Sequence, residues 1–312
     1  INHATPAAFY AHVPSRSLYY EIAMQIPNSN YDVFAGGGIN QPSGRDNDKS
    51  DAHDIINNSG YKIINTIEEI KNYNKKNQKV ILTSPFIGAD ADMLYAIDQP
   101  DNYFTLADFL AKTIELIFNE DGFFIMLEGG KIDWCAHDND ASTVIREVID
   151  FDNAVKIAYE FYLKYPDETL IVVTADHETG GLAIGYDGKG YDTDLKILQN
   201  QKNSINFITN TILQKCENKK ITFEEFLSWG EFFNIEKNSY SAAELNILIS
   251  VFENYKKKKE KTITVSKDNT KKLVSSHMKI FNNRAGIAWT SGSHTGTPVP
   301  VWSIGQNSEL FE

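Results

Sequence analysis

The sequence contains only two cysteines, Cys135 and Cys216, which excludes a framework of several disulfides and leaves the redox compartment open. No apolar run approaches the roughly 18 residues that a membrane-spanning helix requires, so no membrane span is expected. Positive charge is also scarce, since 30 Lys and Arg stand against 42 Asp and Glu and give a formal net charge of −12. Because this charge repels nucleic-acid backbones, we expect no nucleic acid among the partners.

The apolar residues form segments in which strand-like runs alternate with stretches of helical spacing. Short apolar runs at residues 79–88, 122–127 and 169–174 suit buried strands, the last of them fully buried. Residues 105–119 and 141–165 show helical spacing, and Thr105 can cap the first helix with Asp108 three residues on. This order predicts an α/β fold, with a mostly parallel central sheet and helices on both of its faces.

The composition changes between residues 186 and 279. This stretch is dense in Lys and Asn and contains amphipathic helical segments at 223–233 and 242–255, so we predict a helical insertion. The charged run at 256–261 is interpreted as a solvated helix end or loop and is assigned no function. No linker separates independent domains, so we expect residues 1–312 to form one domain that includes the variable insertion 186–279.

Acidic and imidazole side chains follow the predicted strands. Glu128 ends one strand, and Asp133 and His137 come next with a spacing of four, which places both on one face of a helix. Asp176 and His177 follow the 169–174 strand, and His294 lies beside a glycine turn. Because loops beyond strand ends converge in such sheets, the three segments together favour a metal site of the kind that zinc prefers.

Other residues favour structural roles. The Gly36-Gly37-Gly38 run lacks a following Gly-Lys-Ser/Thr, so a turn at a strand end is expected rather than a phosphate loop. Cys135 is expected to be a small buried filler between ligand positions. Glu178 fits equally well as a partner that orients His177 and as a solvated turn residue.

Four segments carry a resemblance to a known family. The stretches HATPAAFYAHVPSR (3–16), EGGKIDWCAHDND (128–140), TADHETGG (174–181) and HTGTPVPV (294–301) resemble successive motifs of the alkaline phosphatase family, in the family's order. The resemblance implies one zinc held by Asp133, His137 and His294, a second zinc held by Asp176 and His177, and a magnesium held by Thr5 and Glu128. It also implies that Arg16 clamps the phosphate, with His3 and Trp134 on the substrate side of the site.

The implied function is zinc- and magnesium-dependent hydrolysis of small phosphate monoesters through a phosphoserine intermediate. The family's nucleophilic serine and its bridging aspartate belong to motifs that are absent from these 312 residues, so we expect an N-terminally incomplete chain. A related two-metal phosphodiesterase or mutase, and a non-catalytic metal-binding remnant, remain alternatives. Family likeness further suggests a homodimer in the periplasm or outside the cell.

Overall fold

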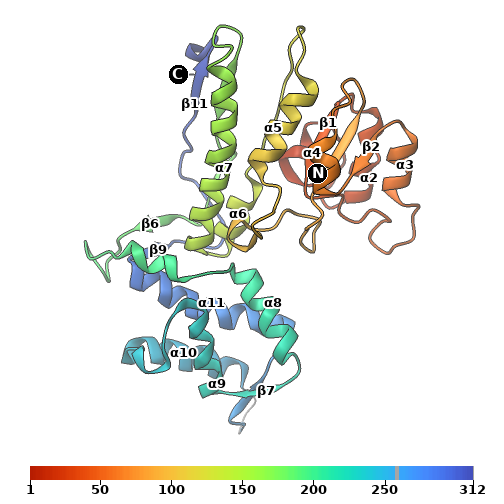
Figure 1. The fold of residues 1–312 in the computed structure, drawn as a ribbon. Coiled ribbons are helices and arrows are strands. Elements are labelled where there is room, and N and C mark those ends of the chain that lie inside the picture. The colour runs from red at the N-terminus through yellow and green to blue at the C-terminus, as the bar shows by residue number, and fades with distance from the viewer. Residues whose placement is uncertain (257–259, 312) are drawn as a thin grey trace.

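The structure is a computed structural model that describes residues 1–256 and 260–311. Figure 1 shows a small sheet surrounded by helices at the N-terminal end, two long helices beside it, and a separate helical region formed by the blue-green segments. Among the described residues, no helix combines the length and the hydropathy needed to cross a membrane.

The N-terminal sheet has three parallel strands in the order β1 (Val33–Gly36), β3 (Val80–Thr83) and β2 (Lys62–Ile64). Successive side chains of β3 point to opposite faces, as strand geometry requires. Val80 and Leu82 pack with residues of α4 (Ile67–Asn72) and α5 (Leu106–Ile117), whereas Ile81 packs with α2 (Tyr19–Ala23) and α3 (Ala52–Asn58). Helices therefore cover both faces, which confirms this part of the predicted fold.

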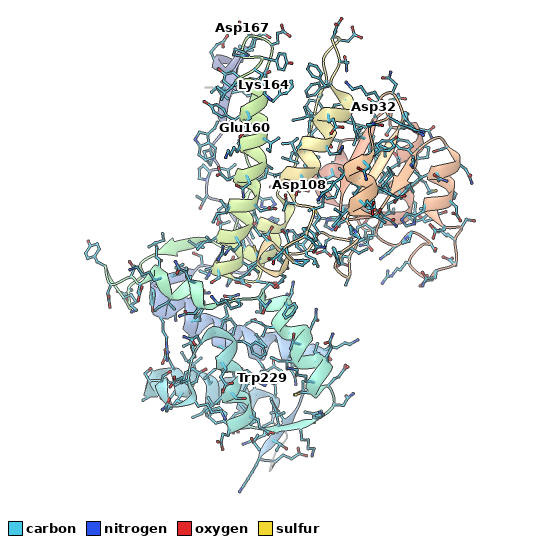
Figure 2. All side chains as sticks on the ribbon, viewed as in Figure 1. Asp32, Asp108, Glu160, Lys164, Asp167 and Trp229 are labelled. Atoms are coloured by element: carbon cyan, nitrogen blue, oxygen red, sulfur yellow. The ribbon has the colours of Figure 1, made fainter. Side chains whose placement is uncertain are left out.

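The long helices lie where the sequence predicts them. Thr105 and Asp108 form a reciprocal capping box at the start of α5, where Figure 2 labels Asp108. The second predicted helix is α7 (Ala141–Tyr162), which packs along α5 (Figure 1). Between them, α6 (Gly130–His137) is the short helix that carries the Asp133 and His137 spacing.

Two predicted strands differ from expectation. Residues 122–127 form no strand in the described structure, and Phe124 is 65% exposed. Residues 169–174 form β4 (Leu170–Val173), yet Leu170 and Val172 are exposed, so the prediction of a fully buried strand is wrong. An apolar run shows that a segment can be buried, whereas burial itself depends on distant neighbours. Within residues 1–256 and 260–311, β4 pairs with one strand, the antiparallel β11 (Trp302–Gly305).

The predicted insertion is helical. It contains the 3-10 helix η3 (Leu195–Asn200), α8 (Ile205–Cys216), α9 (Phe223–Leu227), η4 (Ser228–Phe233), α10 (Ala242–Tyr255), α11 (Lys267–Ala285) and a ribbon of β7 (Lys220–Thr222) and β8 (Thr262–Thr264). The helices predicted at 223–233 and 242–255 are confirmed, and α11 continues past residue 279. Trp229, labelled in Figure 2, lies in the apolar core of this region. Residues 257–259 of the charged run at 256–261 lie outside the described residues.

Short elements complete the fold and bring distant segments together. They are α1 (Ala4–Ala8), β5 (Glu178–Thr179), β6 (Leu182–Ile184), β9 (Ile287–Trp289) and β10 (His294–Thr295). The β6 strand pairs with β9, and β5 pairs with β10, both antiparallel. These pairs join the segment after β4 to the segment after α11.

The glycine run lies at the end of β1, where Gly36 is the last strand residue and Gly37 forms a bend, which fits the predicted structural turn at a strand end. Gly36 has φ +140°, which is open to glycine and unfavourable for other residues. A Cβ on Gly37 would lie 2.2 Å from the carbonyl oxygen of Ala91, so the two backbones approach too closely for a side chain.

Gly37→Ala should therefore destabilise the protein by about 1–3 kcal/mol, the usual effect of overpacking. Denaturant unfolding at neutral pH measures this change. Gly296→Ala is a matched control, since a Cβ there meets no atom within 4 Å. Equal unfolding free energies for the two variants would contradict the turn assignment.

Candidate metal centre

Three predicted ligands converge in the structure. Asp133 and His137 lie one turn apart on α6, and β10 brings His294 to them from the other end of the sequence. The Nε2 atom of His137 lies 3.4 Å from Asp133 Oδ1 and 3.2 Å from His294 Nε2, and His294 Nε2 lies 3.8 Å from Asp133 Oδ1. One ligand atom from each residue lies within 4.8 Å of the others, which is compatible with a shared ion.

Hydrogen bonds outside this cluster orient its members. The Nδ1 atom of His137 lies 2.8 Å from the carbonyl oxygen of Gly292. A carbonyl oxygen can only accept, so Nδ1 carries the proton and the lone pair of Nε2 faces the cluster. Thr179 Oγ1 donates to Asp133 Oδ1 at 2.6 Å. Such outer partners are typical of ligands that hold zinc, so the donor set fits the metal that the sequence predicts.

The second predicted pair lies beside the first group. The ring of His177 stacks on that of His294, with centroids 3.5 Å apart, and His177 Nε2 lies 3.2 Å from Asp176 Oδ2. The pairing of β5 with β10 produces this proximity, since it sets His294 opposite Thr179. The structure thus brings Asp176 and His177 to the edge of the Asp133 cluster.

Glu178 stabilises the turn between β5 and β6 and ties it to β10. Its carboxylate accepts a hydrogen bond from the backbone N–H of Gly181 at 2.9 Å and a short one from Thr295 Oγ1. These contacts favour the turn role over the orientation of His177.

The predicted magnesium ligands also meet. Burial raises the pKa of the Glu128 carboxyl, and a side-chain hydrogen bond from Thr5 opposes that rise. The negative charges of Asp176 and Asp133 raise the same pKa further, so the three carboxylates repel one another electrostatically. A cation shared among these acidic side chains would neutralise their mutual repulsion.

Two of the predicted substrate residues, His3 and Trp134, lie side by side. The ring of His3 lies edge-on to Trp134, with centroids 5.5 Å apart, and stacks on Tyr19 at 5.5 Å. Burial lowers the pKa of His3, and the positive charge of Arg16 lowers it further. The Arg16 side chain itself is exposed, so its guanidinium is accessible to an anion.

Several residues of the centre were not predicted. Lys131 forms a short ion pair with Asp92, and its Nζ atom lies 3.7 Å from the ring centroid of Tyr95 and 4.6 Å from that of Trp134. Lys131 lies inside the EGGKID stretch and could have been considered, as could Thr179 in TADHETGG. Asp92 and Tyr95 carry no local signal, because tertiary packing alone places them here.

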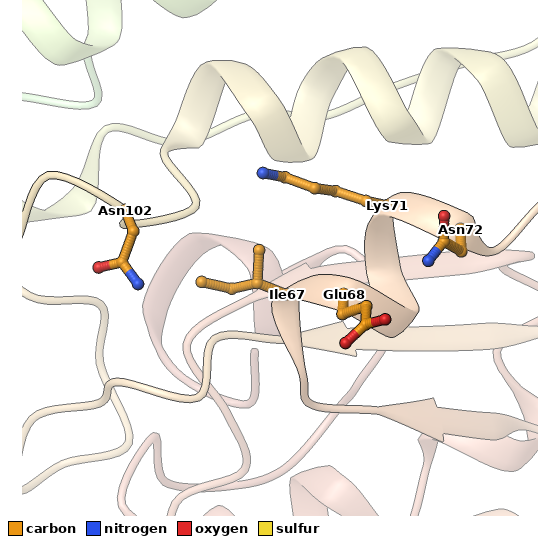
Figure 3. A pocket seen from close by; sticks show the side chains of 5 residues that line it. All are labelled: Ile67, Glu68, Lys71, Asn72 and Asn102. Atoms are coloured by element: carbon orange, nitrogen blue, oxygen red, sulfur yellow. The ribbon is translucent and has the colours of Figure 1, made fainter.

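Two other features are separate from this centre. Cys135 on α6 is buried, its thiol donates to the Ile132 carbonyl oxygen, and burial raises its thiol pKa, so the prediction of an inert filler is confirmed. A shallow pocket, shown in Figure 3, contains none of the predicted site residues. It is lined by Ile67, Glu68, Lys71, Asn72 and Asn102.

Curated relatives match the whole chain. The protein is 32% identical to "Alkaline phosphatase 4" of Bacillus subtilis, with 100% of this chain and 62% of the relative covered. It is 27% identical to "Repressible alkaline phosphatase" of Saccharomyces cerevisiae, with 97% of this chain and 57% of the relative covered. The chain thus spans about three fifths of the length of these relatives.

Solved structures and a family model agree with these matches. The cold-active alkaline phosphatase of the psychrophile Shewanella sp. superposes with a TM-score of 0.75 at 29% identity, over 100% of this chain and 69% of that one. A variant of TAB5 alkaline phosphatase with Mg bound in its M3 site gives a TM-score of 0.61 at 26% identity, over 100% of this chain and 64% of that one. The family model "Alkaline phosphatase" matches residues 1–312, and the chain therefore belongs to the alkaline phosphatase family.

Proposed function

We propose that the protein hydrolyses phosphate monoesters with the aid of zinc and magnesium. The observation that carries this proposal is the convergence of Asp133, His137 and His294, with the Nε2 lone pair of His137 directed into the cluster by the Gly292 carbonyl. Membership of the alkaline phosphatase family supports the reaction class.

The proposed metal assignment follows the three groups of side chains. Asp133, His137 and His294 would hold one Zn²⁺, Asp176 and His177 a second Zn²⁺, and Thr5 and Glu128 a Mg²⁺. When bound, such ions supply the positive charge that stabilises attacking and leaving oxygens during phosphoryl transfer. The TAB5 variants that hold Mg in their M3 site carry Glu or Asp in place of a histidine, which agrees with a carboxylate such as Glu128 as a ligand of the third ion.

We propose that Arg16 is the residue of this chain that holds the phosphoryl group. Its planar guanidinium can donate two parallel hydrogen bonds to phosphate oxygens, which lysine cannot do. His3 and Trp134 border the same rim and would contact the substrate. Because these groups recognise phosphate and little else, small phosphomonoesters of varied structure are the expected substrates.

The proposed phosphoserine route requires a nucleophilic serine. Ser291 and Ser293 lie close to His294 in sequence, but Ser291 Oγ donates to the Ser293 carbonyl oxygen and accepts from the Ser293 N–H, as a turn residue does. We therefore propose that the serine belongs to a part of the family fold outside these 312 residues. We also propose that the whole protein is a homodimer of the periplasm or extracellular space, as the family likeness suggests.

The proposal is tested on the protein expressed with any adjoining coding sequence. We expect hydrolysis of an aryl phosphate that is lost on chelation and restored by Zn²⁺ with Mg²⁺. Faster cleavage of an aryl phosphodiester would instead identify a phosphodiesterase. A zinc-loaded protein that turns over neither ester would overturn the proposed activity and identify a metal-binding remnant.

A further inference from the structure

The loop that follows the ligand His137 is held by the helical insertion. Lys271 Nζ on α11 lies 2.7 Å from Asp138 Oδ1, and Asn282 Nδ2 on the same helix donates to the Asn139 carbonyl oxygen at 2.8 Å. Asp140 is fully buried, and its carboxylate accepts from Gln201 Nε2 at 2.8 Å and from the Ile205 N–H at 2.9 Å. Asp138 and Asp140 thus contact the insertion, and Asn139 contacts the end of α11 just beyond residue 279.

The same helix also leads to the other histidine. After α11, the chain forms β9 and then the turn at 290–293 that ends in His294. The Gly292 carbonyl in this turn orients His137. The Asn139 amide is satisfied when its nitrogen is assigned to the side of the turn, where it donates to the Ser291 carbonyl oxygen at 2.8 Å and to that of Ala136 at 3.1 Å. Asn139 therefore links α6, the 290–293 turn and α11.

We propose that the helical insertion positions the first metal site, with Asn282 and Asp140 as positioning residues that act through the loop 138–140. The hydrogen bond from Asn282 holds Asn139 in place. Asn139 then determines how far the turn at 290–293 lies from α6. This separation sets the distance between the Nε2 atoms of His137 and His294. The inference rests on the proposed zinc site and assigns to the insertion a role in metal affinity.

A purely structural role would give a different pattern of effects, and α11 offers a matched control. Asn269, like Asn282, is a buried amide that donates to a backbone carbonyl oxygen at 2.8 Å. Its acceptor is Thr264, inside the insertion, so Asn269→Ala disturbs the same helix without touching the metal loop.

The experiment measures Zn²⁺ affinity of the purified chain by competition with a chromogenic chelator, and melting temperature in the metal-free state. We expect Asn282→Ala to weaken Zn²⁺ binding about tenfold, the lower end of the loss found for partners that bond a ligand directly, because Asn282 acts through Asn139. Asn269→Ala should lower the melting temperature comparably, with Zn²⁺ affinity within about twofold of the wild type. Bound Co²⁺ should show a changed visible spectrum only in Asn282→Ala.

Results that contradict the positioning role differ from results that contradict the metal site itself. Equal affinities for wild type and Asn282→Ala, or equal losses in both Asn variants, overturn the positioning role. A wild-type chain that binds no Zn²⁺ overturns the proposed metal site, and the inference with it. If Asn282→Ala does not fold, Lys271→Ala, at a partly exposed position, and Lys272→Ala, at the exposed position beside it, give the same comparison. Among the described ion pairs only Lys271 contacts the loop.

Discussion

Replacing His294 by alanine should weaken binding of the first Zn²⁺ by more than about 100-fold. Loss of an outer partner of a metal site already weakens binding about 10–100-fold, and His294 is one of the three proposed ligands that cluster among the described residues. The variant also loses the ring that stacks on His177, so the proposed second zinc site should weaken as well. Zinc content after dialysis, measured by atomic emission, reports both effects.

A histidine outside the centre provides the control for this measurement. His53 forms a local contact with Asp51 at the start of α3, and its Nδ1 atom lies 2.8 Å from the Asp51 carboxylate. His53→Ala should therefore retain the zinc content of the wild type. Unchanged zinc in His294→Ala, or an equal loss in both variants, would remove the basis for the proposed site.

The second large effect concerns stability at acidic pH. His277 lies fully buried in the insertion, where its Nδ1 atom is 2.8 Å from Tyr240 Oη and its ring meets Phe226 edge-on. Burial lowers its pKa to about 3, so the folded protein favours the neutral imidazole. Above the unfolded pKa of about 6.5 the imidazole is neutral in both states and does not reduce the free energy of unfolding. As the pH falls from there towards 3, protonation favours the unfolded state, so the free energy of unfolding declines. The loss should reach roughly 3 kcal/mol at about pH 4.5.

Comparison with His277→Gln isolates this effect. Glutamine cannot be protonated in this range and can still bond to Tyr240. Burial raises the pKa of Asp140 to about 6 and that of Glu147 to about 7, so both groups stabilise the fold as the pH falls. They do so in both proteins and cancel in the difference. If the difference in unfolding free energy stays constant from about pH 7 to 4.5, His277 does not control the acid transition.

Features that depend on residues close together in the sequence could be predicted, whereas those that depend on distant residues could not. The capping box of Thr105 and the spacing of Asp133 and His137 are local signals, and α5 and α6 form where those signals lie. The meeting of Asp133 with His294 was expected from the convergence of strand-end loops, but the structure brings it about with α6 and the antiparallel pair of β5 and β10. Backbone acceptors such as the Gly292 carbonyl have no sequence signature, so the orientation of His137 required the structure.

The predictions of a strand at 122–127 and of full burial at 169–174 failed for the opposite reason. The runs at 122–127 and 169–174 are apolar enough for a core, yet Phe124 and Val172 are exposed because burial needs partners that are distant in sequence. Local propensity cannot supply those partners.

The ribbon of β4 and β11 also affects how the isolated chain behaves in solution. Val172 and Trp302 are exposed on opposite faces of the ribbon, and the second edge of β4 has no ladder partner in residues 1–256 and 260–311. Unpaired amide and carbonyl groups along such an edge act as a template for intermolecular pairing. Light scattering of this chain should therefore rise steeply with concentration, and a lysine introduced at the edge should suppress that rise.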